Sequence, residues 1–258
     1  MLVDVHCHLD DPRFKDDLDK VIERAKNAGV KAIISNGTTP KSNMRVLELS
    51  KKYDIIKPAF GMYPISALNK KSLSGEAPEF YEFDADECAE MIRKRRKEII
   101  AIGEVGMDFK YSQDKELQKE HFQKMIDLAE EIKKPLIVHS RKAEAEVIEM
   151  LSKTKAKVLM HCFSGKKKLF EKGVGLGMYF SIPANILRSD QFKEWVEIAP
   201  ITQLLTETDS PYLSHMKGER NEPCNVAETV KEIARIKKME QIEVENNIFM
   251  NYQRLFLG

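Results

Sequence analysis

The sequence predicts a closed (β/α)8 barrel, the TIM barrel, and two observations lead to this fold class. Short runs rich in β-branched residues alternate with longer amphipathic segments, a pattern typical of a parallel sheet whose strands are joined by helices. Eight such runs are present in 258 residues, close to the usual length of this barrel. We therefore expect a single domain over residues 1–258, with a doubly wound open sheet as the alternative.

The expected strands are short apolar runs such as LVDVH and PLIVH. In order, they are residues 2–6, 31–36, 55–60, 98–103, 135–139, 157–161, 176–181 and 201–207. The expected helices carry apolar residues at helical spacing and cover residues 16–28, 41–53, 85–97, 115–133, 142–153, 166–172, 189–198, 224–238 and 241–256. A long segment, residues 64–84, follows the third strand on the barrel face where active sites lie.

The amino-acid composition limits the classes of protein to which this chain can belong. Apolar residues make up 42% of the chain and charged residues 32%, enough for a core under a charged surface. The 42 Lys and Arg nearly balance the 41 Asp and Glu, so any surface for a phosphate-bearing substrate has to be local. The four cysteines lie far apart, no segment resembles a signal peptide, and no apolar run reaches the length of a membrane span. We therefore expect a cytoplasmic protein without membrane contact.

Six histidine or acidic residues stand at the carboxyl ends of the expected strands. They are His6 and His8 on the first strand, Glu104 on the fourth, His139 on the fifth, His161 on the sixth and Asp209 after the eighth. In a barrel these ends meet on one face. Alternate residues of a strand point to the same side, so His6 and His8 can reach one ion, with Cys7 packed away from it.

Imidazole and carboxylate groups suit divalent Zn, Mn, Ni, Fe or Co, and less comfortably Mg. A catalytic zinc usually has three protein ligands and a water, so six ligands indicate two metal ions joined by a carboxylate. Each residue alone also has a structural interpretation, a hydrogen-bonded histidine or, for Glu104, a helix N-cap or ion-pair partner. Four of the six histidines at strand ends favour the metal site, and the other two, His121 and His215, are expected on the surface.

These motifs resemble those of the TatD family of metal-dependent deoxyribonucleases, within the amidohydrolase-like barrels. DVHCHLD is similar to the family's opening D-x-H-x-H, GEVGMDF to its bridging-glutamate motif, IVHSR and HCFSG to its third and fourth histidines, and TETDSPYL with RNEP to its C-terminal signature. The resemblance runs nearly end to end. It implies a first metal held by His6, His8, Glu104 and Asp209 and a second held by Glu104, His139 and His161. It also implies that Asp209, with Glu104, is catalytic and that Asp209 orients or deprotonates the attacking water.

The chain departs from the family after the third strand. Members usually carry Gly-x-His-Pro-His there, whereas this chain reads GMYPIS, so Tyr63 and Ile65 replace both histidines. A tyrosine can still donate a hydrogen bond to a phosphate oxygen, but it cannot carry a positive charge there near neutral pH.

Further side chains on the same face are expected to contact the substrate. The expected substrate-binding residues are Tyr63, Arg141, Phe163, Tyr212 and Arg220. The cations would position phosphates, and the rings could stack on bases. Lys166–Lys168 fit either this surface or a solvated helix start, and the run RKRRK at 93–97 is expected on the opposite face.

Three functions are open at this point. The first is a deoxyribonuclease that cleaves phosphodiester bonds with a water activated by two metals, and DNA would be the partner of a monomer or small homo-oligomer. The second is an amide or ester hydrolase, such as a D-aminoacyl-tRNA deacylase or a small-molecule amidohydrolase. The third is a metal-dependent partner protein without activity. Many relatives of the second kind bridge their metals with a carboxylated lysine, and Glu104 stands in that place here, which favours the first.

Overall fold

The computed structural model describes residues 1–68, 83–112 and 114–258, and within them eight parallel strands follow one another in chain order. The strands are β1 (Leu2–Cys7), β2 (Val30–Asn36), β3 (Ile56–Phe60), β4 (Ala101–Gly106), β5 (Leu136–His139), β6 (Val158–Met160), β7 (Tyr179–Pro183) and β8 (Leu204–Glu207). The first and last strands meet where Cys7 bridges to Ser210 and the amide of Asp209 donates to the carbonyl of His6 at 2.8 Å. The predicted (β/α)8 barrel is confirmed.

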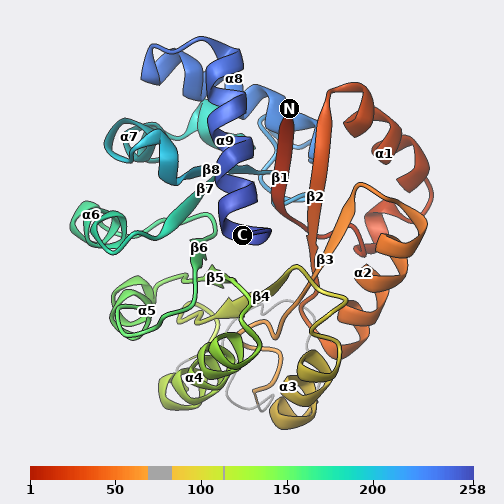
Figure 1. Cartoon of the computed structure of the whole chain (residues 1–258), viewed down its shortest axis with the longest axis vertical. Helices are drawn as coiled ribbons and strands as arrows, with labels where there is room; N and C mark the ends of the chain where they lie inside the picture. The colour runs from red at the N-terminus through yellow and green to blue at the C-terminus, as the bar shows by residue number, and fades with distance from the viewer. Residues whose placement is uncertain (69–82, 113) are drawn as a thin grey trace.

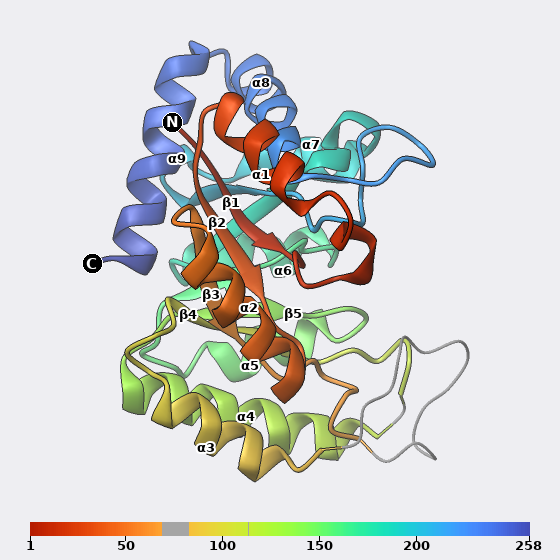
Figure 2. The ribbon, with the colours of Figure 1, turned by 90° about the vertical axis from the view of Figure 1, so that its right-hand side faces the viewer.

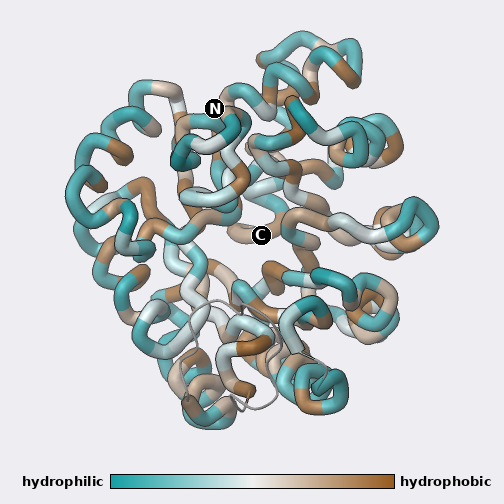
Figure 3. Tube along the Cα trace, turned by 180° about the vertical axis from the view of Figure 1, so that it is seen from behind, coloured by the Kyte–Doolittle hydropathy of each residue, from teal (hydrophilic) through white to brown (hydrophobic). Residues whose placement is uncertain are grey.

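Helices surround these strands. They are α1 (Leu18–Asn27), α2 (Pro40–Lys52), α3 (Ala85–Lys94), α4 (Lys115–Ile132), α5 (Glu144–Leu151), α6 (Lys167–Gly175), α7 (Asp190–Ile198), α8 (Val226–Lys237) and α9 (Gln241–Phe256). In Figure 1, α1 to α8 follow one another round the outside of the sheet. Figure 3 shows hydrophobic residues concentrated along the central strands and hydrophilic residues along the outer helices. No helix in the described ranges combines the length and hydropathy needed to cross a bilayer.

Local signals fix where the helices begin. The Thr39 side chain accepts a hydrogen bond from the amide of Ser42 at 3.2 Å, and Pro40 occupies the first helical position of α2. Asp84 accepts from the amides of Asp86 and Glu87 at the start of α3. Side chains of these types satisfy amides that have no partner inside the helix, so the loops after the strands end at defined points.

The last helix, α9, closes the end of the barrel at which the strands begin. Figure 2 shows it beside the N-terminus, on the side from which β1 starts. Nδ2 of Asn251 donates to the carbonyls of Ile201 and Leu204 at 2.7 and 2.8 Å, just before and at the start of β8. Because α9 occupies this end, the opposite end, where the strands finish, is left for a site.

The structure corrects some expected boundaries. The fourth strand covers Ala101–Gly106 rather than 98–103, because the amide of Glu98 closes a turn onto the carbonyl of Arg95 at 2.8 Å. The eighth begins at Leu204, since Ile201–Gln203 form a 3-10 turn. Of the long segment 64–84, residues 69–82 lie outside the described ranges, so the role expected for that loop is not addressed by the structure.

Candidate metal centre

A first group of four potential ligands meets at the carboxyl ends of the strands. Nε2 of His6 lies 3.3 Å from Nε2 of His8. Oε2 of Glu104 lies 3.5 Å from each of these nitrogens. Oδ1 of Asp209 lies 3.6 Å from the His6 nitrogen and 3.4 Å from the His8 nitrogen. The family resemblance implied these four residues as one ligand set, and the structure brings them together.

Most separations within this group match the spacing of ligands around one ion. Nitrogen and oxygen ligands lie about 2.0 to 2.2 Å from zinc, and the corners of a tetrahedron of that radius are roughly 3.3 to 3.6 Å apart. The distances within His6, His8 and Asp209, and those from Glu104 to the two histidines, run from 3.3 to 3.6 Å. His6, His8 and Asp209, whose ligand atoms all lie within 4.8 Å of one another, can therefore hold a divalent ion, with Glu104 beside the two histidines.

The other oxygen of Glu104 faces a second group. Oε1 of Glu104 lies 2.8 Å from Nδ1 of His139 and 3.8 Å from Nε2 of His161. Ligand atoms of these three residues all lie within 4.8 Å of one another. A carboxylate whose two oxygens face different sets of imidazoles has the arrangement of a bridging ligand. Three protein ligands also leave positions for water or substrate, as catalytic metal sites do.

The turn after β8 places Asp209 beside β1. Asp209 has φ 53°, in the left-handed region that aspartate tolerates better than most side chains. Its amide donates to the carbonyl of His6, and its own carbonyl accepts from the amide of Tyr212, both at 2.8 Å. Asp4 strengthens the same seam, because its carboxylate accepts from the amide and the hydroxyl of Thr208 at 3.0 and 2.6 Å.

The ionisable side chains of the cluster shift one another's pKa values. Burial disfavours the imidazolium of His8, but the hydrogen bond with Asp209 and the charges of Glu104 and Asp209 outweigh burial and raise its pKa to about 10. Burial is outweighed at His139 as well, where the hydrogen bonds with Asp108 and Glu104 raise the pKa to about 10. Burial works against ionised Glu104, yet the hydrogen bonds with His139 and His6 hold its pKa well below the usual range. Without metal, His8 and His139 are therefore imidazolium groups beside the Glu104 carboxylate, whereas burial lowers the pKa of His6.

Comparison with known proteins identifies the family. The profile of the family described as TatD related DNase matches residues 3–257. The chain belongs to the TatD family. A metal-dependent hydrolase of Methanocaldococcus jannaschii, described as uncharacterised, is 37% identical to this chain over 254 residues, 98% of this chain and 96% of the relative. Human deoxyribonuclease TATDN3 is 35% identical over 262 residues, 99% of this chain and 94% of the relative.

A solved structure agrees with these relatives. The crystal structure of YJJV, a TatD homolog from Escherichia coli K12, matches with a TM-score of 0.85 at 25% identity and covers 100% of this chain and 98% of that one. The resemblance inferred from the motifs is thus confirmed, and this TatD-family chain is a metal-dependent hydrolase.

Two carboxylates to which the sequence analysis gave no role contact histidines of this TatD-family site. Each lies next to the ring nitrogen that does not face Glu104. Oδ2 of Asp108 lies 3.0 Å from Nε2 of His139. Oε2 of Glu207 lies 2.9 Å from Nδ1 of His161 and accepts from the hydroxyl of Ser181 at 2.5 Å. Both carboxylates are fully buried. A carboxylate behind a ligating histidine fixes which ring nitrogen carries the proton and how the ring is oriented.

Replacing Glu207 by glutamine is therefore expected to weaken metal binding by about 10- to 100-fold, the usual effect of losing such a partner. The amide keeps the shape of the side chain but removes the charge that holds the proton on Nδ1 of His161. Isothermal titration with zinc would measure the change. The matched variant Ser181→Ala removes only the hydroxyl that donates to Glu207 and should have a smaller effect. Unchanged zinc affinity in Glu207→Gln would contradict the assignment.

Metal binding is also expected to release at least about two protons per chain at pH 7. His8 and His139 have pKa values of about 10 in the metal-free cluster and carry protons at this pH, whereas metal ligands must be neutral imidazoles. Affinity should accordingly rise as the pH is raised towards 10. Titrating metal in two buffers of different ionisation enthalpy measures the number of protons, and heats that do not depend on the buffer would refute the expectation.

Tyr63 has a different partner from the one expected. Its hydroxyl lies 3.1 Å from Oδ2 of Asp108, and its ring meets that of His139 edge to face at 5.1 Å. Burial holds the pKa of Tyr63 well above its usual value, so the phenol keeps its proton. A phenol has one proton to donate, and the Asp108 carboxylate can only accept it. The Tyr63 hydroxyl therefore donates its hydrogen bond to Asp108, the partner of His139, rather than to a phosphate.

Phe163 and Arg220 are engaged elsewhere. Phe163 is 1% exposed and packs among Phe170, Phe180 and Trp195, so it has no free face for a base. This burial replaces the stacking role expected from the sequence. Arg220 binds the Asp17 carboxylate at 2.8 and 2.6 Å through its two terminal nitrogens. Its guanidinium therefore joins two loops instead of standing free for a phosphate.

Tyr212 and Arg141 do lie at the surface, as expected for residues that contact a substrate. The Tyr212 side chain is 49% exposed, and its ring centre is 6.4 Å from that of His8. Arg141 is exposed and lies over the ring of Tyr111 at 5.4 Å, two positions after His139.

His121, expected at the surface, is instead buried on α4.

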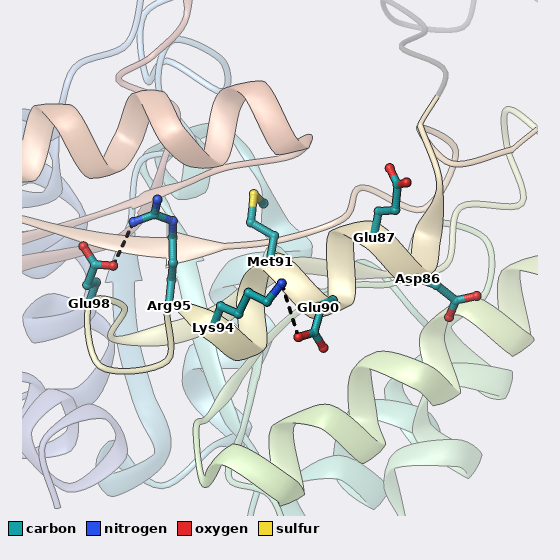
Figure 4. Close-up of a pocket in the computed structure, with 7 residues that line it drawn as sticks. All are labelled: Asp86, Glu87, Glu90, Met91, Lys94, Arg95 and Glu98. Atoms are coloured by element: carbon teal, nitrogen blue, oxygen red, sulfur yellow. Dashed lines mark hydrogen bonds and ion pairs between the residues drawn. The ribbon is translucent and has the colours of Figure 1, made fainter.

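A surface hollow along α3 is separate from this centre. It is lined by Asp86, Glu87, Glu90, Met91, Lys94, Arg95 and Glu98, which Figure 4 shows along the helix and the turn after it. Ion pairs such as Arg95 with Glu98, at 2.9 Å, already join its charged groups. None of its lining residues is a predicted site residue, so the hollow adds nothing to the metal centre.

Proposed function

We propose that this chain is a deoxyribonuclease that hydrolyses phosphodiester bonds with two divalent metal ions. His6, His8, Glu104 and Asp209 would hold the first ion, and Glu104, His139 and His161 the second. The observation that carries the proposal is the Glu104 carboxylate, whose two oxygens face the two groups at 3.5 Å and 2.8 Å. The deoxyribonuclease name of the human relative supports DNA as the substrate.

The solvent-facing side of the cluster suggests where a substrate arrives. Side chains of Asp209, His8 and His139 are 16%, 14% and 13% exposed, whereas those of His6 and Glu104 are 0% and 4% exposed. A phosphodiester would therefore approach over the first three residues. Ions bound here would polarise a phosphoryl oxygen and lower the pKa of water, and zinc, manganese, nickel, cobalt and magnesium are the candidates.

Asp209 is placed to act as the base. Burial works against its ionisation, but the hydrogen bond with His8 and the charges of His161 and His6 lower its pKa below the usual value. It is therefore a carboxylate at neutral pH and can accept the proton of the attacking water. Glu104, whose side chain is 4% exposed and pairs with His6 and His139, is less accessible to water and would bridge the two ligand groups.

Release of nucleotides from single- and double-stranded DNA by the metal-loaded protein tests this function. We expect cleavage that depends on a divalent metal and is lost in His139→Ala. The matched variant His121→Ala changes a histidine of α4 outside both ligand groups and should retain activity once its folding is verified. A metal-loaded protein that leaves all nucleic acids intact but hydrolyses an amide or an aminoacyl ester, D-aminoacyl-tRNA included, would replace the proposal with the second function.

A further inference from the structure

An aromatic ring is left half exposed beside the metal ligands. Tyr212 is 49% exposed, and its ring lies edge to face with that of His8, at 6.4 Å between centres. The turn after β8 holds it there, because its amide donates to the carbonyl of Asp209 at 2.8 Å. A ring of this size is usually buried more completely, so its exposure next to a site indicates a surface for a ligand.

A guanidinium covers part of this ring. Cζ of Arg13 lies 4.3 Å from the centre of the Tyr212 ring. Asp11 fixes the guanidinium with two hydrogen bonds of 2.8 Å, and Arg220 donates to the carbonyl of Arg13 at 2.6 Å. The pair is ordered before a ligand arrives, so binding on it loses little side-chain entropy.

The charge of Arg13 is already balanced. The Asp11 carboxylate occupies two donors of the guanidinium fork, the same geometry that a phosphate would need. What remains accessible is flat surface, since the Arg13 side chain is 47% exposed and Tyr212 is 49% exposed. Flat guanidinium and phenol faces suit stacking on a planar ring better than capture of an anion.

We propose that Arg13 and Tyr212 form a stacking subsite for the unpaired base of a nucleotide close to the phosphodiester that is cleaved. The inference rests on the proposed function and names its substrate class. Stacked bases follow one another about every 3.4 Å along a strand, so a ring 6.4 Å from His8 lies within roughly two base steps of the ligands. Neighbouring bases cover one another in a duplex, so the subsite favours single strands and frayed ends.

Two polymers with the same backbone test the subsite. One is oligothymidylate, and the other is an oligomer of equal length in which every residue is abasic. We expect Tyr212→Leu to lower kcat/KM on oligothymidylate by roughly 5- to 150-fold, the range that corresponds to losing one base–aromatic stack. The abasic polymer should be cleaved within about twofold of wild type, because it has no base to stack. Arg13→Lys, which keeps the charge but removes the flat guanidinium, should show the same selectivity for the base-bearing polymer.

The conservative variant Tyr212→Phe keeps the ring and should recover most of the rate on oligothymidylate that Tyr212→Leu loses. An equal loss on both polymers, or no loss on either, would overturn the subsite. Wild-type protein that cleaves neither polymer with any metal would contradict the proposed function instead. In that case, binding of fluorescent oligothymidylate, followed by anisotropy, still decides the inference: affinity unchanged by Tyr212→Leu rejects the subsite, and a 5- to 150-fold loss supports it.

Discussion

Replacing Glu104 by glutamine is expected to remove most of the bound metal and to lower kcat/KM by at least about 10³-fold. Its two oxygens face His6 at 3.5 Å and His139 at 2.8 Å, so one substitution weakens both ligand groups. Metal ions at hydrolytic sites contribute several kcal/mol to catalysis, and about 1.36 kcal/mol corresponds to a factor of ten in rate. Metal content by mass spectrometry and kinetics on the same sample measure the two effects.

The matched variant Glu98→Gln changes an exposed glutamate that pairs with Arg95 at 2.9 Å, before β4. It should leave metal content and rate unchanged. Melting temperatures of both variants separate loss of metal from loss of the fold. If Glu104→Gln still held two ions with near-normal affinity, the carboxylate would not be the shared ligand.

The convergence of the candidate ligands was predictable because it depends on backbone geometry that the sequence encodes directly. His6 and His8 are two apart on one strand, and strands of a parallel barrel end on one face, so alternation and topology together bring distant residues close. The shift of β4 from 98–103 to Ala101–Gly106 did not alter this, since Glu104 lies in the carboxyl-terminal half of the observed strand.

Roles that depend on side-chain contacts were less predictable. Asp108 and Glu207 were visible in the motifs GEVGMDF and TETDSPYL, but only tertiary structure puts them behind His139 and His161. A charged residue near a site can bind a ligand or form an ion pair within the protein, and the sequence does not distinguish these two roles. Arg220 was expected to bind a phosphate, yet Asp17 from a distant loop takes both of its terminal nitrogens.

The residues that match the family pattern differ from those that would contact a substrate. The candidate metal ligands reproduce the family pattern, whereas Tyr63 stands where the family usually has a histidine and donates a hydrogen bond to Asp108. A phenol in that place supports His139 without adding positive charge near the substrate. Under the proposed function, recognition of a phosphodiester would then depend more on the bound ions and on the proposed contact with Tyr212 than on a cationic side chain at position 63.

Changing Asp209 to asparagine is expected to lower turnover by about 10²- to 10⁴-fold at saturating metal, the usual contribution of a general base. Asparagine keeps an oxygen that can face His6 and His8, now at 3.6 and 3.4 Å from Oδ1, but it cannot accept a proton. The pKa of Asp209 is held below its usual value, so the wild-type rate should fall only when acid protonates this carboxylate. The variant should lack that acid limb. Rate–pH profiles at several metal concentrations measure both effects.

Saturating metal is what separates the two roles of Asp209. If the residue served only as a ligand, a higher metal concentration would restore the rate of Asp209→Asn, because His6, His8 and Glu104 remain to hold the ion. A base cannot be restored in this way, since the missing group accepts a proton rather than a metal. Asp190→Asn on α7, where the carboxylate is fully exposed, supplies the matched control and should match wild type at every pH. Recovery of the Asp209→Asn rate to within tenfold of wild type would assign Asp209 to metal binding alone and leave the proton acceptor to be found elsewhere.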